Sequence, residues 1–138
     1  MTEQEVTDFL ATQVRAWQQG QTEPIAQAFA AQGVFLAPGF SAIGPQQIAT
    51  AAADYFKHYH KLKVQVRHIW IQEQRVALEW DWSDTKIDSG ETITTREAVM
   101  IDFDQAGKVL EWREYFSREK PTPSLEQVVP TQTLNIMG

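Results

Sequence analysis

The chain has 138 residues, 43% of them hydrophobic, and a net charge of −6 from 12 Lys and Arg against 18 Asp and Glu. This length fits one domain with a substantial core, and the negative charge disfavours binding to nucleic acid. No stretch has the roughly 18 apolar residues that a membrane span needs, and the first residues do not resemble a signal peptide. We therefore expect a cytoplasmic protein without nucleic-acid or membrane partners. The absence of cysteine excludes disulfides and thiolate chemistry.

The first third of the chain predicts helices. A capping-box pattern at residues 2–5, an apolar stripe and Gly20 predict a helix that ends near residue 19. A short helix is expected from about Pro24 until Gly33 breaks it, followed by a strand at 34–37. A third helix is expected from Gly44 to about Tyr59. The stripe of the first helix consists of Val6, Phe9, Leu10, Val14 and Trp17, and the second helix is expected to bury Ile25, Ala28 and Phe29.

The second half of the chain predicts strands, because the apolar period changes to two. Strands are expected at about 61–70, 76–82, 91–103 and 109–117, with a polar loop at 84–90 and a hairpin connection at 104–107. Three helices followed by four consecutive antiparallel strands indicate an α+β fold, with the helices on one face of the sheet. We expect one domain over residues 1–120 and an extended tail over 121–138, which contains three prolines.

Glu114 is the clearest chemical candidate from periodicity. It shares a strand face with Leu110, Trp112 and Phe116, which would surround its carboxyl group with hydrocarbon. Such burial raises the pKa of a carboxyl group and suits it to acid–base catalysis. The alternative is a structural pair between Glu114 and an arginine.

Other candidates have ordinary structural alternatives. His68 interrupts an apolar face and is either a pocket acid–base group or a core histidine. Tyr55 on the third helix offers a hydroxyl to a ligand or simply packs. Trp80 and Trp82 either stack on a flat ligand or fill the core or a dimer interface. His58 and His60 do not have metal-ligand spacing on a helix, and no phosphate loop or dinucleotide fingerprint is present, so we expect neither a metal nor a cofactor.

The segment Gly-Lys-Val-Leu-Glu-Trp-Arg-Glu-Tyr-Phe at 107–116 resembles the last hairpin of SnoaL-like proteins, part of the nuclear transport factor 2-like superfamily. The end of the first helix, the Gly-Val-Phe at 33–35, Gly44 and the Tyr-Phe at 55–56 agree with this resemblance, which covers about residues 5–118. It implies helices packed in the concave face of a curved, mainly antiparallel sheet, and a homodimer. It does not imply one activity, because the superfamily combines polyketide cyclases, isomerases, dehydratases, epoxide hydrolases and non-catalytic modules.

Two enzymes of this superfamily can be compared by residue. Ketosteroid isomerase places a carboxylate before the proline that follows its first strand and a tyrosine on its first helix, where this chain has Ala37 and Gln13. Limonene epoxide hydrolase uses an arginine between two acids. The resemblance aligns that arginine with Arg96, one acid with Glu114 and the other acid with Ala98, so the relay would be incomplete.

Arg96 and Glu97 compete for the inward position on the same strand. The alignment turns Arg96 into the pocket, where it would hold a ligand oxygen or tune Glu114. The apolar alternation of Ile93, Val99, Ile101 and Phe103 instead turns Glu97 inward, and only a bulge would reconcile the two. The alignment is the working prediction, so Arg96 is expected to face the pocket.

The leading hypothesis is a SnoaL-like protein that binds a small apolar or aromatic molecule and acts as a cyclase-, isomerase- or hydratase-type enzyme. Glu114 and Arg96 would be catalytic, and the ligand-binding residues would be Trp112, Trp80, Tyr55, His68 and Phe116. The alternatives are a non-catalytic binding or dimerisation module with a structural pair of Arg96 and Glu114, and a scaffold whose cavity is filled. A cavity well below about 300 Å³ would favour the scaffold.

Overall fold

The computed structural model of the protein describes residues 1–117. Its elements, in chain order, are α1 (Glu3–Gln18), α2 (Thr22–Gln27), β1 (Phe29–Ala37), β2 (Phe40–Ile43), α3 (Gly44–His58), β3 (Tyr59–Gln72), β4 (Arg75–Lys86), β5 (Thr92–Phe103) and β6 (Val109–Tyr115). The predicted domain end at residue 120 and the tail at 121–138 lie outside the described residues and stay predictions. Within residues 1–117, no helix is long and apolar enough to cross a membrane.

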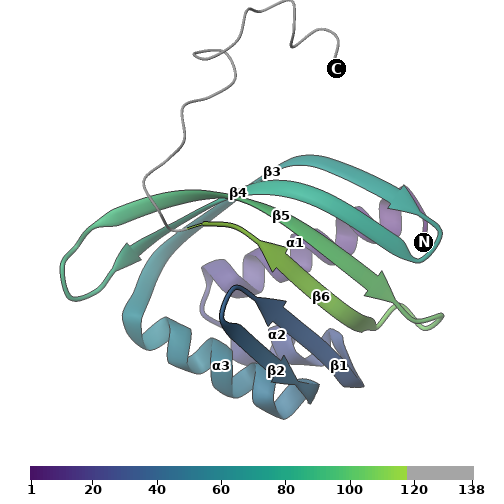
Figure 1. Ribbon diagram of the computed structural model, residues 1–138, viewed down its shortest axis with the longest axis horizontal. Helices are drawn as coiled ribbons and strands as arrows, with labels where there is room; N and C mark the ends of the chain where they lie inside the picture. The colour runs from purple at the N-terminus through teal and green to yellow at the C-terminus, as the bar shows by residue number, and fades with distance from the viewer. Residues whose placement is uncertain (118–138) are drawn as a thin grey trace, which may run out of the picture.

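The six strands form one sheet in the order β2-β1-β6-β5-β4-β3. All neighbouring pairs are antiparallel except β1 and β6, which run parallel. The sheet arches over the helices, which lie together beneath it (Figure 1). The predicted α+β fold with helices in the concave face of a curved, mainly antiparallel sheet is thus confirmed.

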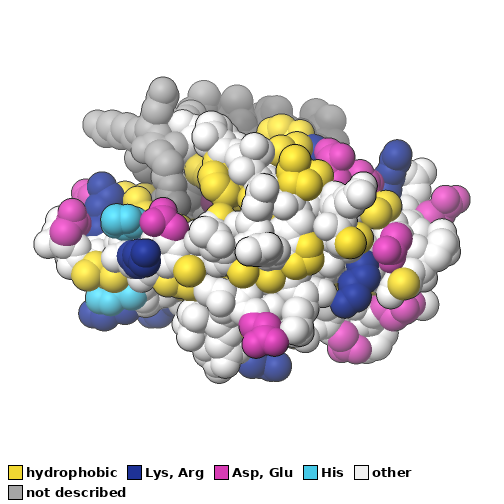
Figure 2. Space-filling view, turned by 90° about the horizontal axis from the view of Figure 1, so that it is seen from below, with side chains coloured by type: hydrophobic (Ala, Val, Ile, Leu, Met, Phe, Trp, Pro, Cys, Tyr) yellow, Lys and Arg dark blue, Asp and Glu magenta, His cyan; other side chains and the backbone are white. Residues whose placement is uncertain are grey.

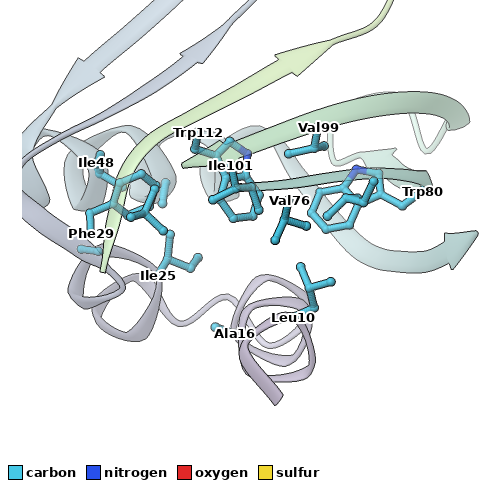
Figure 3. Packing of buried hydrophobic residues seen from close by; sticks show 14 of the residues in the cluster. Leu10, Ala16, Ile25, Phe29, Ile48, Val76, Trp80, Val99, Ile101 and Trp112 are labelled. Atoms are coloured by element: carbon cyan, nitrogen blue, oxygen red, sulfur yellow. The ribbon is translucent and has the colours of Figure 1, made fainter. Parts of the chain in front are cut away.

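The core fills the space between this arch and the helices. The strands turn Val76, Trp80, Val99, Ile101 and Trp112 inward, and each is at most 1% exposed. They point toward Leu10 and Ala16 of α1 and toward Ile25 and Phe29 (Figure 3). Buried residues alternate with more exposed ones along β4 from Arg75 to Asp84 and along most of β5, and this produces a single inner layer, because side chains on a strand alternate between the two faces.

The short elements at the start of the sheet differ from the prediction. The second helix ends at Gln27, Phe29 already belongs to β1, and β2 was not predicted. Along β1, the five-residue step from Phe29 to Val34 faces a two-residue step on β6, from Val109 to Glu111, so the strand bulges at this point. This bulge interrupts the period-two pattern and makes the first half of β1 look like the end of a helix.

The end of β4 also differs. The sequence predicts a polar loop from residue 84, but β4 continues to Lys86, and Asp84 and Thr85 are 0% and 6% exposed. The Thr85 hydroxyl lies 2.8 Å from that of Thr92 on β5, and Asp84 accepts a hydrogen bond from Tyr55 on α3. Polar residues can therefore continue the strand here because tertiary partners satisfy them.

The surface carries charges of both signs. On the face drawn in Figure 2, Lys and Arg side chains lie singly or in small groups among acidic ones, with a broken band of hydrophobic side chains between them. This interspersed pattern on that face is unlike the continuous basic track of a nucleic-acid-binding surface.

Candidate functional site

A cavity of about 470 Å³ lies between α3 and the inner face of the sheet. This volume falls within the range of about 300–1,000 Å³ typical of small-molecule sites, so it does not favour the filled scaffold. Most of its wall is apolar and aromatic, and the ionisable side chains on it are two tyrosines with Asp54, His58, Glu97 and Glu114. The lining residues are Trp17, Phe35, Ala37, Pro38, Phe40, Ala42, Ile48, Ala51, Ala52, Asp54, Tyr55, His58, Tyr59, Trp82, Glu97, Glu114 and Phe116.

Two carboxyl groups enter the cavity from neighbouring strands. Glu114 on β6 pairs with Val99 on β5, and Glu97 lies two residues before Val99 on the same face. Such diagonal neighbours in an antiparallel pair have Cα atoms about 7–8 Å apart, so long side chains of this kind reach a common ligand. Glu97 is 3% exposed, and Glu114 is partly buried.

Each of the two carboxyl groups accepts a hydrogen bond from a buried tryptophan indole. The Trp80 Nε1 atom donates to Glu97 Oε1 at 2.8 Å, and the Trp112 Nε1 atom donates to Glu114 Oε2 at 2.9 Å. These two tryptophans are 0% and 1% exposed and do not themselves line the cavity. Each indole fixes one oxygen of its carboxyl group, which orients the group toward the cavity.

A third indole N–H group donates a hydrogen bond to a tyrosine on the cavity wall. Trp82 Nε1 donates to the hydroxyl oxygen of Tyr55 at 2.9 Å, and this hydroxyl donates to Asp84 Oδ2 at 2.5 Å. Tyr55 and Trp82 line the cavity, whereas Asp84 lies behind them and is fully buried. The phenol ring also stacks on Tyr59 at a centroid distance of 4.9 Å. The site therefore has a polar position on α3 as well as the carboxyl pair on the sheet.

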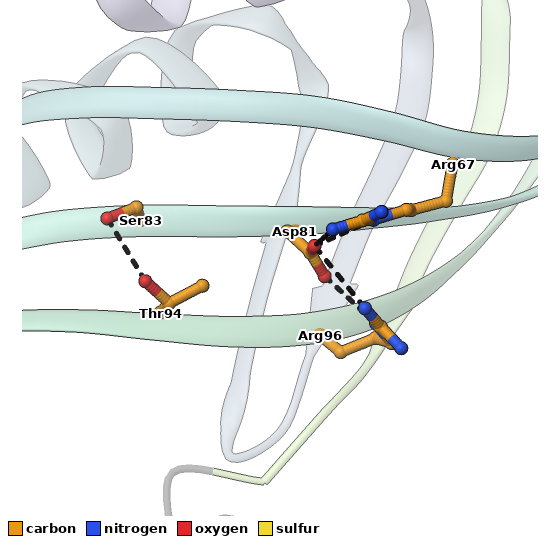
Figure 4. A network of polar contacts seen from close by, with 5 residues as sticks. All are labelled: Arg67, Asp81, Ser83, Thr94 and Arg96. Atoms are coloured by element: carbon orange, nitrogen blue, oxygen red, sulfur yellow. Dashed lines mark hydrogen bonds and ion pairs between the residues drawn. The ribbon is translucent and has the colours of Figure 1, made fainter. Parts of the chain in front are cut away.

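The prediction that Arg96 faces the cavity is wrong. Arg96 lies on the outer face of β5, where its Nε atom donates to Asp81 Oδ1 at 2.9 Å, and Arg67 donates to the same carboxylate (Figure 4). The bond from Arg96 lowers the pKa of Asp81, and the Arg67 bond lowers it further. The register between β4 and β5 runs without a bulge, so the alternation of β5 turns Glu97 inward.

The same observations correct the alternative hypothesis. Because Arg96 pairs with Asp81 on the outer face, it does not form the expected structural pair with Glu114. Ala98, which the alignment gave as the missing second acid, is exposed on the outer face beside Tyr115. The second acid is instead Glu97, one residue earlier.

The five predicted ligand-binding residues divide into three groups. Tyr55 and Phe116 line the cavity. Trp80 and Trp112 lie behind it and act on it through the two glutamates. The prediction for His68 is wrong, because a register shift between Val66 and His68 turns its side chain to the outer face, where it is exposed and lies near Trp70.

Sequence reasoning did not assign Glu97, Asp84 or Trp17 to the site, nor Asp54 and His58, which also line the cavity. Glu97 was indicated by the alternation of β5 but was set aside in favour of the alignment. Asp84 gave no usable signal, because its polar neighbours are typical of a loop. Trp17 was assigned to the stripe of the first helix, yet it contributes its ring to both the packing of Tyr55, at 5.8 Å, and the cavity wall.

An arched, mainly antiparallel sheet over three helices, with an apolar cavity between them, defines an α+β pocket domain. Residues 10–112 match the family of the SnoaL-like domain, and the chain belongs to that family. A comparison with curated protein sequences finds no match.

Solved structures share this fold at low identity. A protein with a ketosteroid isomerase-like fold from Catenulispora acidiphila, in complex with trimethylamine, is 16% identical and has a TM-score of 0.75, over 86% of this chain and 88% of that one. A putative SnoaL-like polyketide cyclase from Shewanella denitrificans is 11% identical, with a TM-score of 0.73 over 84% and 92%. An epoxide hydrolase from M. tuberculosis, similar to limonene epoxide hydrolase, is 17% identical, with a TM-score of 0.70 over 83% and 84%.

Proposed function

We propose that this protein binds a small, largely apolar molecule in the cavity and transfers a proton to or from it with the carboxyl pair of Glu97 and Glu114. The observation that supports this most directly is the position of both carboxyl groups on one wall of an aromatic cavity, each held by a buried indole. A carboxyl group that is fixed within hydrogen-bond reach of a bound ligand can act on it as a general acid or base. Reactions of the cyclase, isomerase or hydratase type need this chemistry.

The residue pattern distinguishes among these reactions. The arginine between two acids, which limonene epoxide hydrolase uses, would lie on the inner face of β5, two residues before Glu97. Thr95 occupies that place and is 6% exposed. Among residues 1–117, Thr95 stands in place of that arginine, and this favours proton transfer at carbon over the opening of an epoxide. A substrate with an acidic C–H bond, such as an enone or a polyketide-like ketone, therefore fits this site better.

The first test is binding. We would measure thermal unfolding with a panel of aromatic polyketide mimics, steroids, terpenoid epoxides and short-chain enones. A ligand at about 100 times its Kd adds about 2.7 kcal/mol to the free energy of unfolding. The variant Ala51→Phe, which places a ring into the cavity, should abolish this shift. The matched variant Ala53→Phe, on the exposed side of α3, should retain it.

The second test is turnover of each ligand that binds. Glu97→Gln and Glu114→Gln should each bind the ligand and convert it at least about 100-fold more slowly, because they remove an acid–base group. Ligands that bind without turnover in the wild type would instead support a non-catalytic binding protein. If no ligand stabilises the wild type, the cavity is not a binding site and the proposal fails.

A homodimer is the second proposal, and one surface favours it. On the outer face of the sheet, Trp70, Met100 and Tyr115 are 55%, 37% and 56% exposed. Trp70, Ala77 and Met100 lie in one row across β3, β4 and β5, and Tyr115 follows in the next row. Exposed aromatic and methionine side chains on one face are typical of protein interfaces. Light scattering at micromolar concentration should give twice the 15.7 kDa of one chain.

A further inference from the structure

The C-terminal part of α3 brings to the cavity two ionisable side chains that the hydrogen bonds described above do not include. Asp54 and His58 both line the cavity and lie one helical turn apart, on the side of α3 that also carries Ala51. The chain has three histidines, and the other two do not line the cavity: His60 is exposed at the start of β3, and His68 lies on the outer face of the sheet. His58 is therefore the histidine that a bound ligand can meet.

The main chain of His58 is fixed, whereas its side chain has no polar partner in the part of the chain that the structure describes. The His58 carbonyl oxygen accepts a hydrogen bond from the Ile87 N–H group at 3.0 Å, in the connection between β4 and β5. The next residue, Tyr59, pairs with Lys86 on β4 and stacks its ring on Tyr55. Within residues 1–117, no hydrogen bond or ion pair involves the imidazole of His58. The backbone thus holds the imidazole at the cavity wall and leaves its ring nitrogens open to a ligand.

His58 and the carboxyl pair approach the cavity from opposite walls. Glu97 and Glu114 lie on β5 and β6, His58 lies on α3, and the cavity is between α3 and the sheet. No lysine or arginine of residues 1–117 lines the cavity. A molecule that fills this space can contact a carboxyl group with one edge and His58 with the other.

Proton transfer at carbon is helped by a second group at the substrate oxygen. When a carboxylate takes a proton from the carbon next to a carbonyl group, the C–H electron pair forms a C=C bond and the carbonyl π electrons move to the oxygen, which becomes an enolate. A hydrogen-bond donor that is already in place at this oxygen stabilises the negative charge as it develops. A neutral imidazole has one N–H group and an imidazolium has two, so His58 can donate in either protonation state.

We propose that His58 binds the carbonyl oxygen of the substrate from α3, while Glu97 or Glu114 exchanges the proton at carbon from the sheet. His58 donates a hydrogen bond to the oxygen of the bound ketone and a stronger, charge-assisted one to the enolate. This inference rests on the proposed function of the cavity and adds the residue that orients the substrate. It also gives the chemical class of the ligand, an apolar ketone or enone whose oxygen faces α3.

The test compares two probes of nearly the same shape. The ketone 2-acetylnaphthalene has an oxygen that accepts a hydrogen bond, and the alkene 2-isopropenylnaphthalene has a CH2 group in its place. Calorimetry at pH 7 gives the Kd of each probe, and the quantity compared is the Kd of the alkene divided by the Kd of the ketone. Because the two probes differ in hydration by the same amount with every variant, a change in this ratio reports the hydrogen bond to the oxygen.

The variants assign the recognition of the oxygen to His58. His58→Leu should lower the ratio of Kd values about fivefold, the effect of one net hydrogen bond, and His58→Gln, whose amide N–H group still donates, should restore part of it. His60→Leu is the matched control, because His60 is exposed two residues away and does not line the cavity, so the ratio should equal that of the wild type. Tyr59→Phe and Asp54→Asn, which change other polar groups of the same wall, should leave the ratio within about twofold of the wild-type value.

The imidazole resonances provide a measurement on the wild type. The variants His58→Gln, His60→Gln and His68→Gln assign the 15N resonances of the three histidines. The ketone should shift the imidazole 15N resonances of His58 more than the alkene does, because these resonances respond to hydrogen bonding as well as to a nearby ring. The resonances of His68, on the outer face of the sheet, should not move with either probe.

Two results would overturn the inference alone. These are a ratio of Kd values that is the same in the wild type and in His58→Leu, and 15N shifts of His58 that are equal for the two probes. Both would leave the proposed function intact, because the probes still bind in the cavity. Failure of the wild type to bind either probe or any compound of the larger panel would overturn the proposed function together with this inference.

Discussion

Three buried indole N–H groups donate to polar groups on the wall of one cavity. Trp80 and Trp112 donate to the two glutamates, and Trp82 donates to Tyr55. A polar atom next to an apolar cavity needs such a partner, since an unsatisfied buried group costs about 1–3 kcal/mol. These three tryptophans of the sheet thus pack in the hydrophobic core and also donate hydrogen bonds to the polar groups of the site.

Replacing Trp80 by Phe should destabilise the protein strongly. The change removes the donor to Glu97 and part of a side chain that is 0% exposed, so the free energy of unfolding should fall by about 2–4 kcal/mol. Trp70→Phe, measured at a concentration at which the protein is monomeric, is the matched control, because Trp70 is 55% exposed in the single chain, and its effect should stay within about 0.5 kcal/mol. Urea unfolding measures the free energy of unfolding of both variants. Similar losses in the two variants would argue against a supporting role for the buried indole.

The Asp81 carboxylate should make stability depend on acid pH. The Arg96 guanidinium, with Arg67, holds the pKa of Asp81 below its usual value of about 3.9. A carboxyl group whose folded pKa is lowered stabilises the protein above its unfolded pKa, and this contribution disappears as the pH falls through the folded pKa. Asp81→Asn should therefore lower the free energy of unfolding by up to about 1 kcal/mol at pH 7, since the ion pairs are partly exposed. At a pH below the folded pKa of Asp81, the substitution should change it by almost nothing.

Urea unfolding of the wild type and of Asp81→Asn, from pH 7 down to a pH below the folded pKa of Asp81, tests this dependence. Asp88→Asn, in the exposed turn after β4, is the control and should follow the wild type. A difference between wild type and Asp81→Asn that stays constant across the pH range would contradict the ion-pair explanation.

At the scale of elements, strand register decides which residues form the site. The uninterrupted pairing of β4 with β5 turns Glu97 inward and Arg96 outward. On β3, the pairing with β4 is interrupted by a register shift between Val66 and His68, and this shift turns His68 to the outer face. One extra residue in a strand reverses the face of every side chain that follows, so a bulge changes a site as much as a substitution does.

The bulge in β1 depends on Gly33. A Cβ atom at this position would lie 2.5 Å from the Val109 carbonyl oxygen and 3.0 Å from that of Ala30, and both are backbone atoms that cannot move aside easily. Gly33→Ala should therefore lower the free energy of unfolding by about 2 kcal/mol or more. The control is Gly39→Ala, where φ is +72° and no atom lies within 4 Å, so only backbone strain of about 1 kcal/mol is expected. Thermal or urea unfolding compares them, and an equal loss would rule out the clash.

At the scale of the whole molecule, the two faces of the sheet have separate roles. The inner face carries the core and the cavity, and the outer face carries ion pairs around exposed apolar side chains. A carboxylate pair on the inner face and an apolar row on the outer face can serve binding and association independently, because the sheet separates them.

The variant Met100→Lys should convert the proposed homodimer to monomer. It places a charge at the end of the outer apolar row, and burying an unpaired charge in an interface is strongly unfavourable. Ile87→Lys, which adds the same charge at a side chain 47% exposed in the connection between β4 and β5, should leave the dimer intact. Light scattering distinguishes these outcomes. A wild type that is monomeric at high micromolar concentration would refute the dimer.

Local pattern in the sequence determined much of this protein. The stripes of α1 and α3, the alternation of β4 and β5, and the inward positions of Trp80, Trp112 and Glu114 all follow from periods that a few neighbouring residues establish. The period failed at the start of β6, where a register shift leaves Leu110, expected on the inner face, 46% exposed and buries Val109 instead. Only the tertiary structure decided the parallel pairing of β1 with β6, the outward turn of His68 and the burial of Asp84. These features depend on partners far along the chain: Asp84 is satisfied by Tyr55, 29 residues away, and no short-range pattern encodes that contact.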